Sequence, residues 1–282
     1  MSHVVLLTAD PERGLSGDQI TDAIAQVGGV PRRLSDSAAE IPVDRPVMAA
    51  VDNADVNCLP AANRRKRLLI ADMDSTMIPV ECIDEIADYA GVRDEVVAIT
   101  EPAMRGEMSF DEALIARVAL MEGLPEKRLE DVWRERISLN SGARVLVQTM
   151  RANGAYAALV SGGFTYFTQR VAAAAGFDEH RANILEIANG ALTGTVGRPI
   201  LGREAKLDAL NALMSMQGIV AADAMAVGDG ANDLAMISAA GLGVAYHAKP
   251  IVAADADASI VHGDLTALLY LQGYAENEFS RG

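Results

Sequence analysis

The stretch Lys66–Glu81, KRLLIADMDSTMIPVE, places two aspartates directly after a short apolar run. Residues 68–71 (LLIA) form a continuous apolar segment, which is typical of a parallel strand covered on both faces. Asp72 and Asp74 therefore follow the carboxyl end of this strand, where open α/β sheets bind their ligands. A lone Asp-x-Asp pair is also compatible with a solvated turn or a helix cap. The rest of the chain must distinguish these interpretations.

Strand-like and helix-like patterns alternate from Lys66 onward. Apolar runs at 68–71, 155–161, 223–229 and 242–246 are separated by helical patterns that include 164–175, 203–216 and 231–240. Such alternation is typical of a doubly wound parallel sheet with helices on both faces. We therefore predict an α/β fold with this core over residues 61–282.

A long helical insertion separates the first two predicted strands. About seventy residues there show helical periodicity, too many for a single crossover, so we expect a helical cap inserted at about 83–136. A crossover helix at 141–153 would follow it. Further on, residues 183–197 (NILEIANGALTGTVG) carry Asn-Gly between alternating apolar residues, which predicts a β-hairpin.

The first sixty residues predict a small, separate α+β unit. A strand is expected at 3–8, a helix at 17–28, and two further strands near 30–36 and 46–51, which together make a βαββ unit over residues 1–60. Residues 53–67 are polar, contain a proline and end in basic residues, so we expect a linker there. The unit could be a packing appendage or a regulatory ligand-binding module.

Composition excludes several classes of function. The 282 residues are 50% hydrophobic and carry a net charge of −15, which argues against nucleic-acid or anionic-membrane partners. The two cysteines, Cys58 and Cys82, are too few for a disulfide framework and indicate a reducing compartment. The apolar runs are shorter than the roughly 18 to 20 residues that a membrane span needs, and the start does not resemble a secretory signal. We expect a cytoplasmic protein.

Polar motifs follow three of the predicted strands: DMDST at 72–76, SGG at 161–163 and GDGAND at 228–233. A dinucleotide-binding loop would need glycine where the last motif has Asp233, and the spacing of an EF-hand also fails. Asp229, Asn232 and Asp233 are hard oxygen ligands that would face Asp72 and Asp74. Such a cluster needs a hard cation to offset its repulsion, and Mg²⁺ suits it.

These motifs together resemble the four signatures of the haloacid dehalogenase-like phosphohydrolases. The signatures are Asp-x-Asp-x-Thr at 72–76, Ser161, Lys206, and Gly-Asp-Gly-x-Asn-Asp at 228–233. More narrowly, DMDSTMIPVECIDEIADYAG, RGEMSFDEALIARVALMEGLP, VSGGF and VGDGANDLAMISAAGLGVAYHAKP resemble segments of the bacterial phosphoserine phosphatases. The resemblance runs from about Arg67 to the end of the chain.

The resemblance implies chemical roles for the acidic residues. Asp72 would attack phosphorus and form an aspartyl-phosphate, and Asp74 would protonate the leaving oxygen and then activate water. Mg²⁺ would be held by Asp72, the Asp74 carbonyl and Asp229, while Asn232 and Asp233 would orient the ligands and waters around it. Asp233 is thus also counted among the metal-site residues.

The resemblance also implies how the substrate is held. Ser161, the N–H of Gly162 and Lys206 would stabilise the transferring phosphoryl group, and Asn232 would lie beside the substrate. In the cap, Glu81 and Arg117 would bind the amino and carboxyl groups of phosphoserine. Met104 and Phe110 would close the pocket against water.

The implied activity is Mg²⁺-dependent hydrolysis of O-phospho-L-serine to L-serine and phosphate, the last step of serine biosynthesis. A phosphatase or phosphotransferase for another small phosphorylated metabolite has the same catalytic signatures, and a catalytically idle metabolite sensor is a rival of another class. The N-terminal unit resembles half of an ACT-type regulatory fold. A homodimer formed through it is possible.

Overall fold

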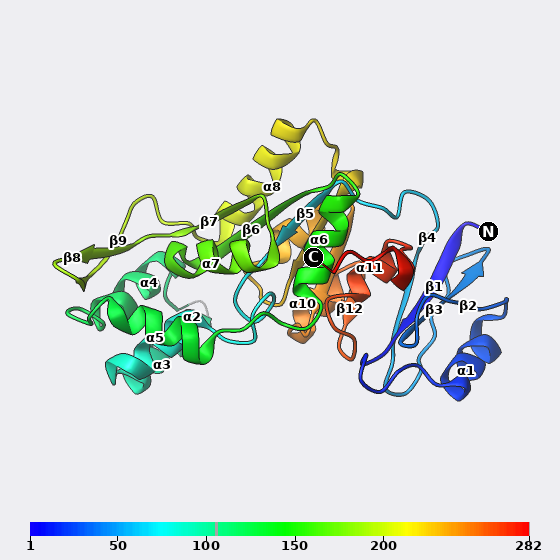
Figure 1. The fold of residues 1–282 in the computed structure, drawn as a ribbon, viewed down its shortest axis with the longest axis horizontal. Helices are drawn as coiled ribbons and strands as arrows, with labels where there is room; N and C mark the ends of the chain where they lie inside the picture. The colour runs from blue at the N-terminus through cyan, green and yellow to red at the C-terminus, as the bar shows by residue number, and fades with distance from the viewer. Residues whose placement is uncertain (105–106, 282) are drawn as a thin grey trace.

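The structure is a computed structural model that describes residues 1–104 and 107–281, without the side chains of Met104 and Arg203. Figure 1 shows an elongated molecule with a parallel sheet in its middle. The cap helices and a β-hairpin lie at one end, and a small N-terminal sheet with its helix lies at the other. The predicted α/β architecture is confirmed.

The central sheet has six parallel strands in the order β12-β11-β10-β5-β6-β7. Its strands are β5 (Leu68–Ala71), β6 (Tyr156–Phe164), β7 (Glu179–Asn183), β10 (Ala224–Gly228), β11 (Leu242–Tyr246) and β12 (Ala258–Ile260). From β5 the chain proceeds outward through β6 and β7, then returns to the other side of β5 at β10. Open α/β sheets bind ligands in the crevice at such a reversal, outside the carboxyl ends of the central strands.

Helices cover both faces of the sheet, as expected for continuous apolar strands. Leu69 and Ala71 of β5 pack with α6 (Ala143–Ala152), α7 (Thr165–Ala175) and α11 (Ala267–Leu271). Leu68 and Ile70 point the other way, toward α8 (Arg203–Gln217), α9 (Leu234–Ala239) and α10 (Pro250–Asp255). Alternate residues of one short strand therefore supply two separate cores, because successive side chains of a strand face opposite sides.

The cap contains α2 (Cys82–Ala90), α3 (Arg93–Met104), α4 (Phe110–Ala119) and α5 (Lys127–Arg136). A hairpin of β8 (Leu185–Ala188) and β9 (Ala191–Val196) packs beside α4, and Asn189-Gly190 forms its turn. Both residues have positive φ, 54° and 75°, as a tight two-residue hairpin turn requires. The hairpin prediction is confirmed.

The N-terminal unit consists of β1 (His3–Thr8), α1 (Gly17–Val27), β2 (Arg32–Arg33), β3 (Ala38–Val43) and β4 (Asp55–Pro60). The strands form an antiparallel sheet in the order β2-β3-β1-β4. Two expectations were wrong. Residues 46–50 are not a strand, and the expected linker contains β4. The polar residues Asp55 and Asn57 made β4 resemble a linker in the sequence, but their side chains bond to backbone groups far along the chain. The division of the chain at residue 60 stays a prediction.

Both faces of the small sheet are covered. Val5 and Leu7 pack with α1, whereas Val4 and Leu6 join the core cluster that contains α11. Figure 1 shows α11 between the small sheet and the body of the core. The unit therefore uses the sheet face that α1 leaves open to attach itself to the core.

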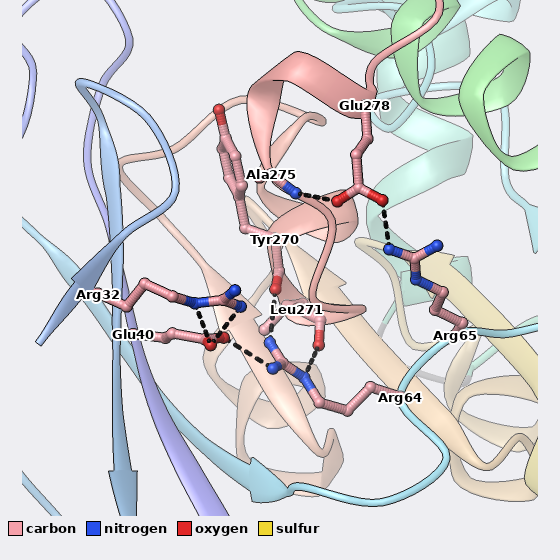
Figure 2. Close-up of polar contacts among 8 residues, drawn as sticks. All are labelled: Arg32, Glu40, Arg64, Arg65, Tyr270, Leu271, Ala275 and Glu278. Atoms are coloured by element: carbon pink, nitrogen blue, oxygen red, sulfur yellow. Dashed lines mark hydrogen bonds and ion pairs between the residues drawn. The ribbon is translucent and has the colours of Figure 1, made fainter.

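A buried carboxylate strengthens this attachment (Figure 2). Glu40 of β3, only 6% exposed, accepts hydrogen bonds from Arg32 at 2.6 Å and Arg64 at 2.7 Å. Arg64 also donates to the carbonyls of Tyr270 at 2.7 Å and Leu271 at 2.8 Å. One guanidinium thus joins β3 to α11. Charge-assisted bonds with this geometry are stronger than neutral ones.

Side chains of β4 also bond to the outer edge of the central sheet. Asn57 donates to the carbonyl of Ser259 at 3.1 Å and accepts from its N–H at 2.9 Å. The carboxylate of Asp55 accepts from the N–H groups of Val261, His262 and Gly263 at 2.8 to 3.2 Å. These bonds satisfy backbone groups at the edge strand β12, which would otherwise need water or another chain.

Two further observations concern membrane-spanning helices and the state of the cysteines. No helix within residues 1–104 and 107–281 is long and apolar enough to span a bilayer. Cys58 and Cys82 are free thiols.

Candidate active site

The three polar motifs meet because the central strands pair in register. Ala71 lies opposite Leu159 of β6 and Val227 of β10. The residues that come next, Asp72 after β5, Ser161 on β6 and Asp229 after β10, therefore reach the same edge of the sheet. The predicted convergence of the three strand ends is observed.

Lys206 lies beside this edge of the sheet. It is the fourth residue of α8, and only 3% of its surface is exposed. Its Nζ lies 2.7 Å from Asp72 Oδ2 and 2.6 Å from Asp233 Oδ1. Burial alone would lower the pKa of Lys206, but the charges of Asp233 and Asp72 raise it above its ordinary value. The ammonium group therefore stays charged and bridges the two carboxylates.

Asp72, Asp229 and Asp233 form a group that could hold a metal ion. One oxygen of each lies within 4.8 Å of the others. Burial and the charge of Asp233 raise the pKa of Asp72, although Lys206 opposes the rise. Burial, Asp233 and Glu81 raise the pKa of Asp229 to about 6. Lys206 contributes one positive charge to three carboxylates, so the group retains an excess of negative charge. An oxygen-only donor set with this excess fits a hard divalent cation.

Asp74 is held differently from the three clustered carboxylates. Its Oδ1 accepts a hydrogen bond from the N–H of Cys82 at 3.0 Å, and its Oδ2 accepts one from Ser161 Oγ at 3.3 Å. Burial and the nearby charge of Glu81 raise the pKa of Asp74 to about 7. A carboxyl group that titrates near neutral pH can both donate and accept a proton. The two aspartates of the motif thus have different surroundings although one residue separates them.

The Ser161–Gly163 turn approaches both Asp74 and the cap. The N–H of Gly163 donates to Ser161 Oγ at 2.8 Å. A β-carbon on Gly163 would lie 2.7 Å from Asp74 Oδ2, and one on Gly162 would lie 3.0 Å from Cζ of Phe110. Side chains at these two positions would push apart the acid and the serine, or displace the Phe110 ring. The predicted pocket residue Phe110 therefore lies directly over the turn.

The cap side of the site begins at Glu81. Its carboxylate accepts a hydrogen bond from Ser75 Oγ at 2.6 Å. Ser75 has φ of +55°, a conformation that residues other than glycine adopt rarely and that is often found at functional sites. Ser75 was not singled out from the sequence. Its position within the DMDST motif is the one signal that could have indicated it.

Arg117 lies on α4, half-buried in the cap. Its Nε donates to the carbonyl of Ala113 at 3.1 Å, and Nη1 donates to Thr100 Oγ1 at 3.4 Å. Burial lowers the pKa of Arg117, while the charges of Asp84 and Glu81 act in the opposite direction. Asp84 and Glu81 are thus close enough to affect the pKa of Arg117. This is compatible with a pocket that has the positive charge of Arg117 on one side and the negative charge of Glu81 on the other.

The other predicted site residues are placed as follows. Asn232 is partly exposed and lies against Gly230 at the turn that follows β10. Met104 is the last residue of α3, and its side chain lies outside the described residues. Thr76, the last residue of the first motif, donates to Asp229 at 3.1 Å and so links two of the three strand ends.

Comparison with known proteins identifies the family. The family of haloacid dehalogenase-like hydrolases matches residues 69–238, which is more than half of the chain. The chain belongs to the haloacid dehalogenase-like hydrolase family. This confirms the resemblance drawn from the four motifs.

Individual members of the haloacid dehalogenase-like family are also similar. A phosphoserine phosphatase of Polaromonas is 49% identical over 210 residues, which cover 73% of this chain and 89% of that protein. The structure of a probable phosphoserine phosphatase from Vibrio cholerae matches with a TM-score of 0.82 at 32% identity, over 98% of this chain and 88% of that chain. This match therefore extends through the N-terminal unit.

A third similar protein bears on the chemistry of this family. It is the structure of a phospho-aspartyl intermediate analogue of phosphoserine phosphatase, with a TM-score of 0.68 and 39% identity. The match covers 73% of this chain and 98% of that chain.

Proposed function

We propose that this protein is a phosphoserine phosphatase that hydrolyses O-phospho-L-serine to L-serine and phosphate through an aspartyl-phosphate on Asp72. One observation carries the proposal. The carboxylate of Asp72 bonds to Lys206, and Asp74, two positions further along the chain, has a pKa of about 7; both follow the end of β5 in a hydrolase core. The relatives that share 73% of the chain bear the name of the same activity.

In the first step, Asp72 would use a carboxylate oxygen to form a bond to phosphorus while the bond from phosphorus to the serine oxygen breaks. Asp74 would transfer its proton to that oxygen, so that serine leaves as a neutral alcohol. A carboxylate nucleophile divides one difficult hydrolysis into two easier displacements. The buried ammonium of Lys206 would favour the ionised form of Asp72.

In the second step, Asp74 would remove a proton from water, whose oxygen then bonds to phosphorus. The bond from phosphorus to Asp72 breaks, and phosphate is released. Both enzyme groups return to their starting forms. A pKa near 7 suits this exchange of roles, because the proton must be given and taken back at the same atom.

We assign the metal site to the carboxylates of Asp72, Asp229 and Asp233 and the main-chain carbonyl of Asp74, and we propose Mg²⁺ as the ion. When bound, the cation would neutralise negative charge on the phosphoryl oxygens and on the clustered carboxylates. Thr76 holds Asp229 at 3.1 Å and Lys206 holds Asp233 at 2.6 Å, so this chain orients two of the ligands itself.

The phosphoryl oxygens would be bound by Ser161, the N–H of Gly162 and Lys206, with Asn232 beside them. Lys206 comes from α8 and bonds to Asp72, whereas Ser161 comes from β6 and donates to Asp74. Donors that are already oriented stabilise charge in the transition state without reorganising.

The amino acid part of the substrate would be bound by the cap. Glu81 would pair with the ammonium, Arg117 with the carboxylate, and Phe110 and Met104 would exclude water. Phe110 supports this arrangement because its ring lies 3.0 Å from the position of a β-carbon on Gly162. The substrate would therefore be held between Ser161–Gly163 at the end of β6, here called the phosphate turn, and α4.

The remaining expectations concern surroundings and assembly. Cytoplasmic location, the absence of nucleic-acid and membrane partners, and a homodimer stay predictions. α1 and α11 cover the two faces of the small sheet, so a dimer formed through this unit would have to use its exposed strand β2 or its helix.

The test is release of inorganic phosphate from O-phospho-L-serine with Mg²⁺, compared with phosphothreonine, a sugar phosphate and a small aryl phosphate at equal concentrations. We expect kcat/KM to be highest for phosphoserine. Higher kcat/KM for another metabolite would overturn the substrate and leave the chemistry. Failure to release phosphate from every monoester would overturn both. Transfer of the phosphoryl group to an added alcohol instead of water would identify a phosphotransferase.

A further inference from the structure

We propose that Asn183 is a positioning residue that holds the hydroxyl of Ser161 in place for phosphoryl transfer, an inference that rests on the proposed function. Asn183 is the last residue of β7, and its surface is 1% exposed. Its amide lies behind the phosphate turn, so we assign it no contact with substrate.

The side-chain amide of Asn183 forms three hydrogen bonds, one to the end of β6 and two to the segment before α8. Its Nδ2 donates to the carbonyls of Gly162 at 2.8 Å and Leu201 at 3.2 Å, and its Oδ1 accepts from the N–H of Leu201 at 2.7 Å. Both polar atoms of a buried side chain are thus used. If these hydrogen bonds are lost, the buried groups left unpaired contribute their full desolvation penalty to the free energy of the fold.

The bond to Gly162 controls the direction of the next N–H. The peptide between Gly162 and Gly163 is trans, so its carbonyl and its N–H point in opposite directions. Asn183 holds the carbonyl, and the N–H of Gly163 donates to Ser161 Oγ at 2.8 Å. Ser161 in turn donates to Asp74 at 3.3 Å. A continuous series of bonds therefore runs from Asn183 to the proposed proton donor.

The bonds to Leu201 connect the same amide to two other parts of the site. Leu201 precedes Gly202, the N-cap of α8, which carries Lys206. A β-carbon on Gly202 would lie 3.5 Å from Cδ1 of Phe110. Asn183 therefore sets the spacing between the phosphate turn and the start of the helix that supplies the buried ammonium.

The chain offers a matched control for the test. Asn57 is also buried and makes the same reciprocal pair of bonds, to the carbonyl and N–H of Ser259, but at the junction of the N-terminal unit. In Asn57→Asp and Asn183→Asp alike, an oxygen replaces the donating Nδ2 and faces a carbonyl. The two variants thus suffer the same chemical change at different places.

The experiment is a double-mutant cycle between Asn183→Asp and Ser161→Ala, with kcat and KM measured on phosphoserine and on a small aryl phosphate. We expect Asn183→Asp to lower kcat about 10-fold to 100-fold on both substrates, somewhat less than loss of a direct transition-state donor. In the Ser161→Ala background the same change should lower kcat about 2-fold or less, because residues that act through one another are not additive. Asn57→Asp should leave kcat within about 2-fold of the parent.

Several outcomes would overturn the proposal. One is an equal loss from Asn183→Asp with and without Ser161, and another is an equal loss of kcat in Asn57→Asp. Asn183→Ala is measured in parallel, with thermal unfolding of each variant. If neither Asn183 variant folds, Asn183 supports the fold and not Ser161, which also overturns the proposal.

The cycle separates this inference from the proposed substrate. If the parent hydrolyses the aryl phosphate but not phosphoserine, the substrate proposal fails while the cycle still measures the coupling of Asn183 to Ser161. If phosphoserine is hydrolysed and the cycle is additive, the positioning role alone fails.

Discussion

Replacement of Lys206 by methionine tests the electrostatic balance of the site most directly. The change keeps a long apolar side chain but removes the ammonium that bonds to Asp72 at 2.7 Å and Asp233 at 2.6 Å. Both carboxylates are buried and would then face each other without this counter-charge. Lys206→Met should therefore destabilise the fold as well as abolish efficient turnover.

The expected magnitude follows from the burial of all three groups. Removing one partner of a buried ion pair costs about 3 to 5 kcal/mol, because an uncompensated charge stays behind. For a chain of this size each kcal/mol lowers the midpoint of thermal unfolding by about 2 to 4 °C. We expect a midpoint about 6 to 20 °C lower in metal-free buffer. Mg²⁺ should restore part of the loss, since a cation bound to the carboxylates replaces some of the missing positive charge.

The pH dependence of this variant has a definite sign. Burial and Asp233 already raise the pKa of Asp72 in the parent, and loss of Lys206 should raise it further. A carboxyl whose folded-state pKa exceeds its unfolded value binds its proton more tightly when folded, so the destabilisation is full at high pH and is relieved as pH falls. The difference in midpoint between variant and parent should shrink from about pH 8 to about pH 5.

The assay is calorimetry or circular dichroism of the parent, Lys206→Met and the exposed control Lys127→Met. A second variant combines Lys206→Met with Asp233→Asn, which removes one of the two stranded charges and should recover part of the midpoint. The reasoning is refuted if Lys206→Met unfolds within about 2 °C of the control in metal-free buffer. It is also refuted if Asp233→Asn deepens the loss.

Three further predictions use the same structure. Asp72→Asn should form no phosphoenzyme, whereas Asp74→Asn, treated with an aryl phosphate, should accumulate phosphate on Asp72 as a mass shift of the active-site peptide; a phosphoenzyme in neither variant would argue for direct attack by water. Arg117→Ala should lower kcat/KM for phosphoserine by an amount that corresponds to about 2 to 5 kcal/mol of activation free energy. The same change should hardly affect kcat/KM for a small aryl phosphate, and equal losses on both substrates would remove Arg117 from substrate recognition. Asp55→Asn should weaken the bonds to residues 261–263, lower the unfolding midpoint and speed amide exchange there, each bond to a charged group contributing about 1.5 to 3 kcal/mol; exchange no faster than in the exposed control Asp52→Asn would contradict this.

The elements near the active site were largely predictable from local sequence patterns. An apolar run followed by DMDST, a second by SGG and a third by GDGAND predicted three strands and the edge of the sheet at which they meet. Parallel strands in one sheet must bring their carboxyl ends together. Local periodicity is therefore sufficient to predict this convergence.

The local pattern was a poorer guide to the edges of the molecule. β7 and β12 were not predicted, since β7 (EHRAN) is largely polar and β12 (ASI) has three residues. β4 was taken for a linker because its polar residues read as loop. Nothing within β4 itself shows that Asp55 and Asn57 bond to backbone groups more than two hundred residues away.

The distribution of charge among the acids was decided by tertiary structure. Asp72 and Asp74 lie in one motif and are separated by one residue, yet Lys206 from α8 binds the first, whereas the N–H of Cys82 and the hydroxyl of Ser161 bind the second. A pKa depends on burial and on charges brought together by the fold, which sequence spacing does not specify. The sequence by itself determined which side chains reach the crevice. Only the packing of β6, α8 and the cap around β5 decided which acid is paired with a cation and which is left able to exchange a proton.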